Sequence, residues 1–387
     1  MRHATAGLVV IMMIAGCVNA DDEPASAYGA WANGPSSDPS FFPIAVWLQA
    51  PGNAAEFKAA GINTYIGLWK GPTEEQLTEL KAEGMKVICD QNDVGLAHLD
   101  DDTIIAWMHG DEPDNAQSDG AGGWGPPVDP AKIEEDYERI AAADPSRPVV
   151  LNLGQGVAWD GWYGRGVRTN HPEDYAEYIK GCDIASFDIY PAVHSKPEVA
   201  GKLEFVAKGV QRLVEWTGGQ KVVWNCIEAS RISNTETKPT PEQIKAEVWM
   251  SLIHGSTGLI YFVHQFKPNF VEASLLQDYE LLPAVTEINA QITELAPVLN
   301  SPSVEGLVSV ETAGADVEIM VKQHDGAIYI FAVAMQDIDT KVEFRFEDIE
   351  SGEAECLGKD QTREITEGSL HDEIYGYGVN LYKVTPN

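Results

Sequence analysis

The sequence predicts an α/β fold, a (β/α)8 barrel, followed by a small antiparallel β-sandwich domain. Over residues 41–299, eight short apolar runs alternate with segments of helical periodicity. From about Ser301 the helical pattern stops, and strand-like runs separated by turns follow to the end of the chain. The length of 387 residues suits one large domain and a smaller one.

Each apolar run of the expected barrel is bounded by turn residues, as short buried strands are. The runs are Pro43–Leu48, Ile62–Leu68, Met85–Asp90, Ile104–Glu112, Pro148–Leu153, Asp183–Tyr190, Lys221–Glu228 and Gly258–His264. Between them, Thr73 and Gln76 form a capping box, and Thr240 precedes Pro241 as an N-cap precedes the first helical residue. The other expected helices are Pro130–Ala143, Pro172–Gly181, Glu204–Thr217, Pro241–His254 and Tyr279–Leu299. A doubly wound open sheet is the alternative, but no glycine-rich phosphate loop follows the first run.

The last part of the chain, residues 300–387, shows alternating or clustered apolar residues without a convincing helix. The expected strands are Val304–Val310, Ala315–Lys322, Ala327–Ala334, Lys341–Phe346 and Val379–Val384. This pattern predicts a small antiparallel β-sandwich.

The N-terminus carries the pattern of an export signal. A short basic start and an apolar run of signal-peptide length occupy residues 1–16, and Ile14–Ala15–Gly16–Cys17 resembles a bacterial lipobox. We expect lipidation of Cys17, a tether over residues 17–40, and an exported bacterial lipoprotein at the outer membrane, the cell surface or in the periplasm. The alternative is ordinary cleavage near Ala20 with loss of Cys17.

The composition excludes some partners. A formal net charge of −34 makes nucleic acid an unsuitable partner, and it leaves a lipid anchor as the only expected contact with a membrane. The remaining cysteines show no zinc-like spacing, so we expect buried free thiols, no metal and no cofactor. These cysteines are Cys89, Cys182, Cys226 and Cys356.

Two glutamates stand where barrel enzymes carry catalytic groups, at the C-terminal ends of strands. Glu112 ends the fourth run and Glu228 ends the seventh. Two carboxyl groups across a barrel mouth suit glycosidic cleavage, in which one protonates the leaving oxygen and the other attacks the anomeric carbon. Taken alone, Glu112 could also be a loop carboxylate at the start of a helix.

Three short motifs resemble those of the clan A glycoside hydrolases, the (β/α)8 group that includes families 5 and 42. They are Gly110–Asp111–Glu112–Pro113, Ile227–Glu228–Ala229 and Ser186–Phe187–Asp188–Ile189–Tyr190–Pro191. The resemblance implies a retaining reaction with Glu112 as acid/base and Glu228 as nucleophile, and a contact of Tyr190 with that nucleophile. Asp111 departs from the clan, which usually has asparagine there. Since an ionised aspartate only accepts hydrogen bonds, either the sugar presents a donor or Asp111 raises the pKa of Glu112.

Further residues at the strand ends are candidates for binding sugar. The ring faces of tryptophans can stack on sugar rings, and carboxylate and amide groups can bind sugar hydroxyls. His264 has the same strand parity as Phe262, which makes it a candidate for facing the pocket. The candidates besides Asp111 and Tyr190 are Trp47, Trp69, Asp90, Asn152, Trp159, Trp162, Asp188, Arg168 and His264. Basic residues including Arg168 also fall in these loops, which suggests a substrate with acidic groups; scattered solvated charge is the alternative.

Three functions therefore stay open. The first is an exported retaining glycoside hydrolase acting on an oligo- or polysaccharide. The second is a non-catalytic carbohydrate-binding lipoprotein, and the third is an inverting hydrolase or a lyase. The separation of the carboxyl groups distinguishes retention, at about 5–5.5 Å, from inversion, at roughly 6.5–9.5 Å.

Overall fold

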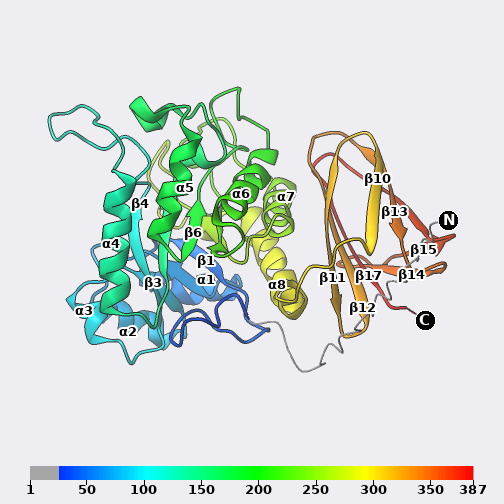
Figure 1. Cartoon of the computed structure of the whole chain (residues 1–387), viewed down its shortest axis with the longest axis horizontal. Helices are drawn as coiled ribbons and strands as arrows, with labels where there is room; N and C mark the ends of the chain where they lie inside the picture. The colour runs from blue at the N-terminus through cyan, green and yellow to red at the C-terminus, as the bar shows by residue number, and fades with distance from the viewer. Residues whose placement is uncertain (1–25, 387) are drawn as a thin grey trace, which may run out of the picture.

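The computed structural model describes residues 26–386, which form a barrel and an all-strand domain lying side by side (Figure 1). The parallel strands of the barrel are β1 (Ile44–Trp47), β2 (Thr64–Ile66), β3 (Lys86–Cys89), β4 (Ile104–Asp111), β5 (Val149–Leu153), β6 (Ile184–Phe187), β7 (Val222–Val223), β8 (Asn225–Glu228) and β9 (Leu259–Phe262). Only Trp224 separates β7 from β8, so these two are halves of one strand position. Since β7 pairs with β6, β8 pairs with β9, and β9 pairs with β1, the sheet closes with eight strand positions. The predicted (β/α)8 barrel is confirmed.

Helices cover the outside of the barrel (Figure 1). They are α1 (Ala54–Ala59), α2 (Glu74–Ala82), α3 (Asp93–Ala97), α4 (Pro130–Ala143), α5 (Tyr175–Tyr178), α6 (Glu204–Thr217), α7 (Pro241–Ile253) and α8 (Leu281–Leu299). Both expected caps form: Thr73 Oγ1 accepts from the Gln76 N–H at 3.3 Å, and Thr240 Oγ1 accepts from the Gln243 N–H at 3.2 Å. The helix expected over 172–181 is mostly 3₁₀, with α5 as its only α-helical turn.

The base of the barrel is closed by residues that we expected to belong to the tether. Tyr28 is only 2% exposed, and its hydroxyl donates to the Thr257 carbonyl at 2.8 Å and accepts from Trp224 Nε1 at 2.9 Å. The tether prediction is therefore wrong for residues 26–40, because the aromatic ring of Tyr28 fills the N-terminal end of the barrel interior. Cys17 and the expected signal segment lie outside the described residues.

The C-terminal domain is built from eight antiparallel strands in the order β10-β13-β16-β15-β14-β17-β12-β11. Their bounds are β10 (Val308–Ala313), β11 (Val317–His324), β12 (Ala327–Ala334), β13 (Thr340–Phe346), β14 (Gly352–Cys356), β15 (Thr362–Thr366), β16 (Ser369–Ile374) and β17 (Val379–Val384). The strands surround one apolar core, which includes Ile330, Phe344 and Leu370. The sequence analysis missed β14, β15 and β16, which are short and rich in charged residues.

The two domains share a buried interface. Trp249 of α7 stacks on Phe331 of β12, with ring centroids 5.0 Å apart. Tyr377 donates its hydroxyl to Glu204 at 2.8 Å, and Lys322 donates to the carbonyl of Leu299 at the end of α8. Apolar packing and buried polar contacts thus fix the all-strand domain against α7 and α8.

All four cysteines within residues 26–386 are buried free thiols, as predicted. In the same part of the chain, no helix combines the length and the apolar character that crossing a membrane requires.

Candidate active site

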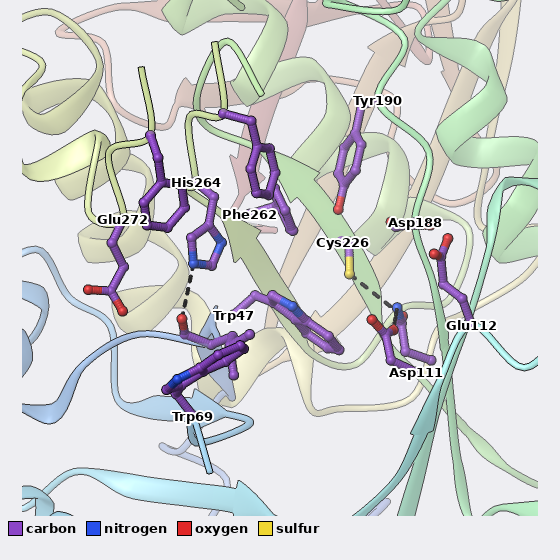
Figure 2. A pocket seen from close by; sticks show the side chains of 14 residues that line it. Trp47, Trp69, Asp111, Glu112, Asp188, Tyr190, Cys226, Phe262, His264 and Glu272 are labelled. Atoms are coloured by element: carbon purple, nitrogen blue, oxygen red, sulfur yellow. Dashed lines mark hydrogen bonds between the residues drawn. The ribbon is translucent and has the colours of Figure 1, made fainter. Parts of the chain in front are cut away.

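A cavity of about 690 Å³ opens at the C-terminal ends of the barrel strands (Figure 2). Carboxyl groups and aromatic rings make up most of its wall. The lining residues are Trp47, Leu48, Trp69, Asp111, Glu112, Asn152, Asp188, Tyr190, Cys226, Phe262, His264, Phe266, Phe270 and Glu272. The position is the one at which barrel enzymes hold their substrates.

The end of β4 carries both Asp111 and Glu112 to the cavity. Strand alternation would send neighbouring side chains to opposite faces, but the register with β5 shifts between Met108 and Asp111. Glu112 then adopts a positive φ of 42°, a conformation that is costly for a residue with a side chain. Its N–H donates to the Asn152 carbonyl at 3.0 Å, which holds the turn in place.

The fully buried side chain of Asp114 fixes the loop after β4 through hydrogen bonds. Its carboxylate accepts hydrogen bonds from the Gly154 N–H at 2.9 Å and the Tyr175 hydroxyl at 2.7 Å. A Cβ at Gly154 would lie 2.8 Å from Glu112 Oε1, so this position needs glycine for the Glu112 carboxyl group to keep its place. The absence of a side chain at Gly154 therefore leaves the space that the Glu112 carboxyl group occupies.

Asn152 at the end of β5 orients Asp111. Its Nδ2 donates to Asp111 Oδ1 at 3.0 Å, and its Oδ1 accepts from the Ser186 hydroxyl at 2.8 Å. Asn152 is only 3% exposed, so its contact with a ligand is limited and its main effect is to position Asp111.

Asp188, just after β6, brings a third carboxyl group beside Glu112 (Figure 2). Burial and the nearby charges of Asp111 and Asp114 raise the pKa of Glu112 to about 7. Burial, followed by the charge of Glu112, raises the pKa of Asp188 well above its usual range. Burial and like charge therefore favour a proton on the Glu112–Asp188 pair near neutral pH.

The structure does not place Glu228 in the cavity. Its carboxylate is fully buried and accepts hydrogen bonds from the Ala192 N–H at 2.6 Å and the Val193 N–H at 2.9 Å. The expected nucleophile is therefore enclosed by the loop after β6. The neighbour of the same parity, Cys226, lines the cavity instead. Tyr190 also lines the cavity, where it lies beside Asp188 rather than Glu228.

The opposite wall comes from the segment after β9. Gln265 and Val271 form an antiparallel bridge, so the side chains that flank the bridge share one face: His264, Phe266, Phe270 and Glu272. His264 Nε2 lies 3.1 Å from the Leu48 carbonyl, which only accepts, and 3.1 Å from Gln49 Nε2, which only donates, so the ring is held between these two groups. The sequence analysis found His264 but missed the other three. The alternation that continues from Phe262 to Phe266 was the available signal.

The expected tryptophans divide into two groups. Trp47 and Trp69 line the cavity, and the Trp69 side chain is 69% exposed there. Trp159 and Trp162 do not line it, because they pack against each other and against Tyr163 in a separate aromatic cluster.

Two other expected binding residues also lie elsewhere. Asp90 lines a second, smaller cavity beside α4, which shares only Asp111 with the first. Arg168 is paired with Asp174, whose Oδ2 accepts from its Nε at 2.9 Å. No lysine or arginine lines the large cavity within the described residues, so the acidic-substrate hypothesis lacks the basic side chains that it required.

No family model matches the chain, and no curated protein matches its sequence. Solved structures do match its fold. An Anoxybacillus α-amylase is 10% identical, with 91% of this chain and 99% of that one covered and a TM-score of 0.55. An α-amylase from Geobacillus thermoleovorans complexed with acarbose is 10% identical, with 92% and 99% covered and a TM-score of 0.52. A putative α-galactosidase/melibiase from Bacteroides fragilis is 10% identical, with 89% and 79% covered and a TM-score of 0.52.

These matches extend over about nine-tenths of this chain, so they include both the barrel and the C-terminal β domain. The architecture is therefore one that carbohydrate-cleaving enzymes use, as the sequence motifs led us to expect. At this level of identity the likeness shows the fold, and the chemistry has to be argued from the cavity.

Proposed function

We propose that this chain is a glycoside hydrolase whose catalytic groups are Glu112 and Asp188. The observation that carries the proposal is the pair itself: two carboxyl groups from β4 and β6 meet in a cavity and hold a proton at neutral pH. A proton held near neutrality is what a leaving glycosidic oxygen requires.

The division of roles that we propose requires the shared proton to move from Asp188, whose pKa is raised well above its usual range, to Glu112. When the proton resides on Glu112, Asp188 is ionised, so Glu112 can protonate the leaving oxygen while an Asp188 oxygen attacks the anomeric carbon. Water then attacks the glycosyl–Asp188 ester and gives its proton to Glu112, which restores both groups. The charge of Asp111 raises the pKa of Glu112 and so favours the protonated form of Glu112.

The closeness of the pair favours retention over inversion. An inverting enzyme keeps its carboxyl groups far enough apart for a water molecule to stand between sugar and base, whereas a retaining enzyme needs only about 5–5.5 Å. Glu112 and Asp188 lie close enough for the charge of Glu112 to raise the pKa of Asp188, which favours the shorter spacing of a retaining enzyme.

The test compares wild type, Glu112→Gln, Asp188→Asn and Glu228→Gln on a broad panel of oligosaccharides, with the anomer of the product determined by NMR. We expect kcat to fall by about 10²–10⁴-fold in the first two variants. Glu228→Gln serves as the matched control and should keep activity within a few-fold of wild type. Full activity in Asp188→Asn, or loss confined to Glu228→Gln, would return the nucleophile to the position expected from the sequence.

Azide separates the two roles. In Asp188→Gly, azide should attack in place of the missing carboxylate and give a glycosyl azide of inverted configuration. In Glu112→Ala, azide should intercept the glycosyl-enzyme and give the retained configuration. A non-catalytic sugar-binding protein would show no product with any variant.

We also propose that the chain is an exported lipoprotein attached through Cys17. The support is the lipobox-like sequence Ile14–Ala15–Gly16–Cys17 after an apolar run. Expression in a bacterial host with labelled palmitate should label the wild type, and Cys17→Ala should remain unlabelled.

A further inference from the structure

The cavity has a fourth carboxyl group, Glu272, that the catalytic proposal does not use. Glu272 stands opposite Asp111 and Glu112, across the floor formed by Trp47 (Figure 2). Its Oε1 accepts from the Ala50 N–H at 3.0 Å, which fixes the carboxylate without neutralising it. This group is therefore built into the wall, on the loop opposite the catalytic pair.

The charges of the cavity all have one sign. Asp111, Glu112, Asp188 and Glu272 line it, and no lysine or arginine is among the lining residues of the described chain. The shared proton neutralises at most part of the catalytic cluster, so the empty cavity remains negative at neutral pH. A site of this kind attracts cations and repels anions.

Most of the charged hydrogen-bonding groups of the cavity are acceptors. Ionised carboxylates only accept, and Asn152 uses its side chain on Asp111 and Ser186. His264 is only 5% exposed, and its Nδ1 has no partner among the described residues. The Tyr190 hydroxyl and the indole groups of Trp47 and Trp69 also line the cavity and can donate. The Glu272 carboxylate only accepts, so a ligand group that binds beside it must supply a donor.

Aromatic faces surround Glu272. The His264 ring stacks with Phe266 and Phe270 at centroid distances of 6.0 Å each, and Trp69 lies on the same side of the cavity in Figure 2. Aromatic faces stabilise a cation held near them, and they also pack on the C–H face of a sugar.

We propose that the Glu272 side of the cavity binds a protonated amino group, so that the substrate is a glycoside containing an amino sugar with a free amine. An ammonium group supplies three donors and one positive charge, which matches acceptors, net charge and aromatic faces together. A hydroxyl offers one donor and no charge. An N-acetyl group offers one donor and adds bulk without charge. The proposal rests on the proposed function for the reaction, but its binding claim can be tested without turnover.

The experiment is an NMR titration of the full chain at pH 6.5 and low salt with glucosamine, N-acetylglucosamine and glucose, and with galactosamine and galactose as a second set. We expect an amine to bind about tenfold more tightly than its neutral counterpart. Glu272→Gln should remove this preference, and Glu79→Gln, which removes an exposed charge on α2, should keep it. Raising the salt concentration should weaken the preference.

The possible outcomes separate the binding proposal from the proposed function. Equal or tighter binding of the neutral or N-acetylated sugar overturns the proposal, as does the absence of amine binding up to about 100 mM or an unchanged preference in Glu272→Gln. Since none of these readouts involves hydrolysis, inactivity of the catalytic variants or of the enzyme on the panel would count against the proposed function alone.

Discussion

The carboxyl groups of Glu228 and Glu247 lie together between β8 and α7, and neither side chain is exposed. Burial is the main reason why the pKa of Glu228 is raised to about 7 and that of Glu247 well above its usual range. Neither carboxyl oxygen of Glu247 has a hydrogen-bond partner among the described residues, apart from its proximity to Glu228. The pair is therefore a protonated acid beside a carboxylate that is held by the N–H groups of Ala192 and Val193.

This pair should make the fold less stable at alkaline pH. The pKa of Glu228 is higher in the folded chain than its ordinary value of 4.5, so its contribution is complete below about 4.5 and is lost as the pH rises through about 7. A shift of this size corresponds to about 3 kcal/mol at full ionisation. The pKa of Glu247 is also raised well above its usual range, so its own contribution to stability is lost with rising pH in the same way. Glu247→Gln removes this titration and should raise Tm at pH 8 by several degrees relative to wild type, and by much less at pH 5.

The matched control for this prediction is Glu242→Gln, an exposed residue on the same helix. Thermal unfolding followed by circular dichroism at pH 5 and pH 8 should show the same pH dependence for this control as for wild type. An equal pH dependence in Glu247→Gln would mean that the buried pair does not titrate in this range.

The pH profile of activity should depend on Asp111. Because Glu112 must be protonated to act as the acid, kcat/KM should fall above about pH 7. Asp111→Asn removes a neighbouring negative charge, so the pKa of Glu112 falls and the alkaline limb moves to lower pH, by about half a unit to one unit. Asp90→Asn, in the neighbouring cavity, should leave the limb in place; a shift in both variants would indicate a general charge effect.

Gly154→Ala should reduce activity without unfolding the protein. The new methyl group would meet Glu112 Oε1 at 2.8 Å and the Asn115 side chain at 2.9 Å, so the flexible end of Glu112 must move. A displacement of this order costs about 10²-fold in kcat. Gly110→Ala adds a methyl group with no neighbour within 4 Å and is the control. Unfolding is monitored through Tm, which should change little in both variants.

Phe331→Ala should destabilise the whole chain, because Phe331 stacks on Trp249 across the domain interface. Loss of a fully buried ring costs about 3–5 kcal/mol. We expect a lower Tm and a barrel that unfolds independently of the C-terminal domain in calorimetry. Tyr375→Ala, which removes an exposed ring of the same domain, should unfold as wild type does.

The architecture was largely predictable from the sequence, since strand runs and helix caps are local signals. The capping box of Thr73 and Gln76 and the run that became β9 depend only on neighbouring residues. The short strands β14, β15 and β16 were missed because their alternation is carried by few apolar residues, such as Ala354 and Ile365. Tyr28 was missed because its burial depends on Trp224, far away in the chain.

The candidate site was predictable only in part, for a geometric reason. Strand parity placed Glu112 and Glu228 on the same inner face, but the register shift after Met108 and the loop at Ala192 changed where the side chains at strand ends point. These features arise from pairing between distant strands. Glu272 was missed because its place opposite the catalytic pair depends on the bridge between Gln265 and Val271.

The position of Tyr28 at the base of the barrel determines at which end of the molecule the N-terminal segment is attached. The described chain begins at the base of the barrel, and the cavity opens at the other end. Whatever precedes residue 26 therefore joins the protein on the side away from the mouth of the cavity. If Cys17 holds the chain on a membrane, as we propose, this attachment would leave the mouth of the cavity on the side away from the lipid.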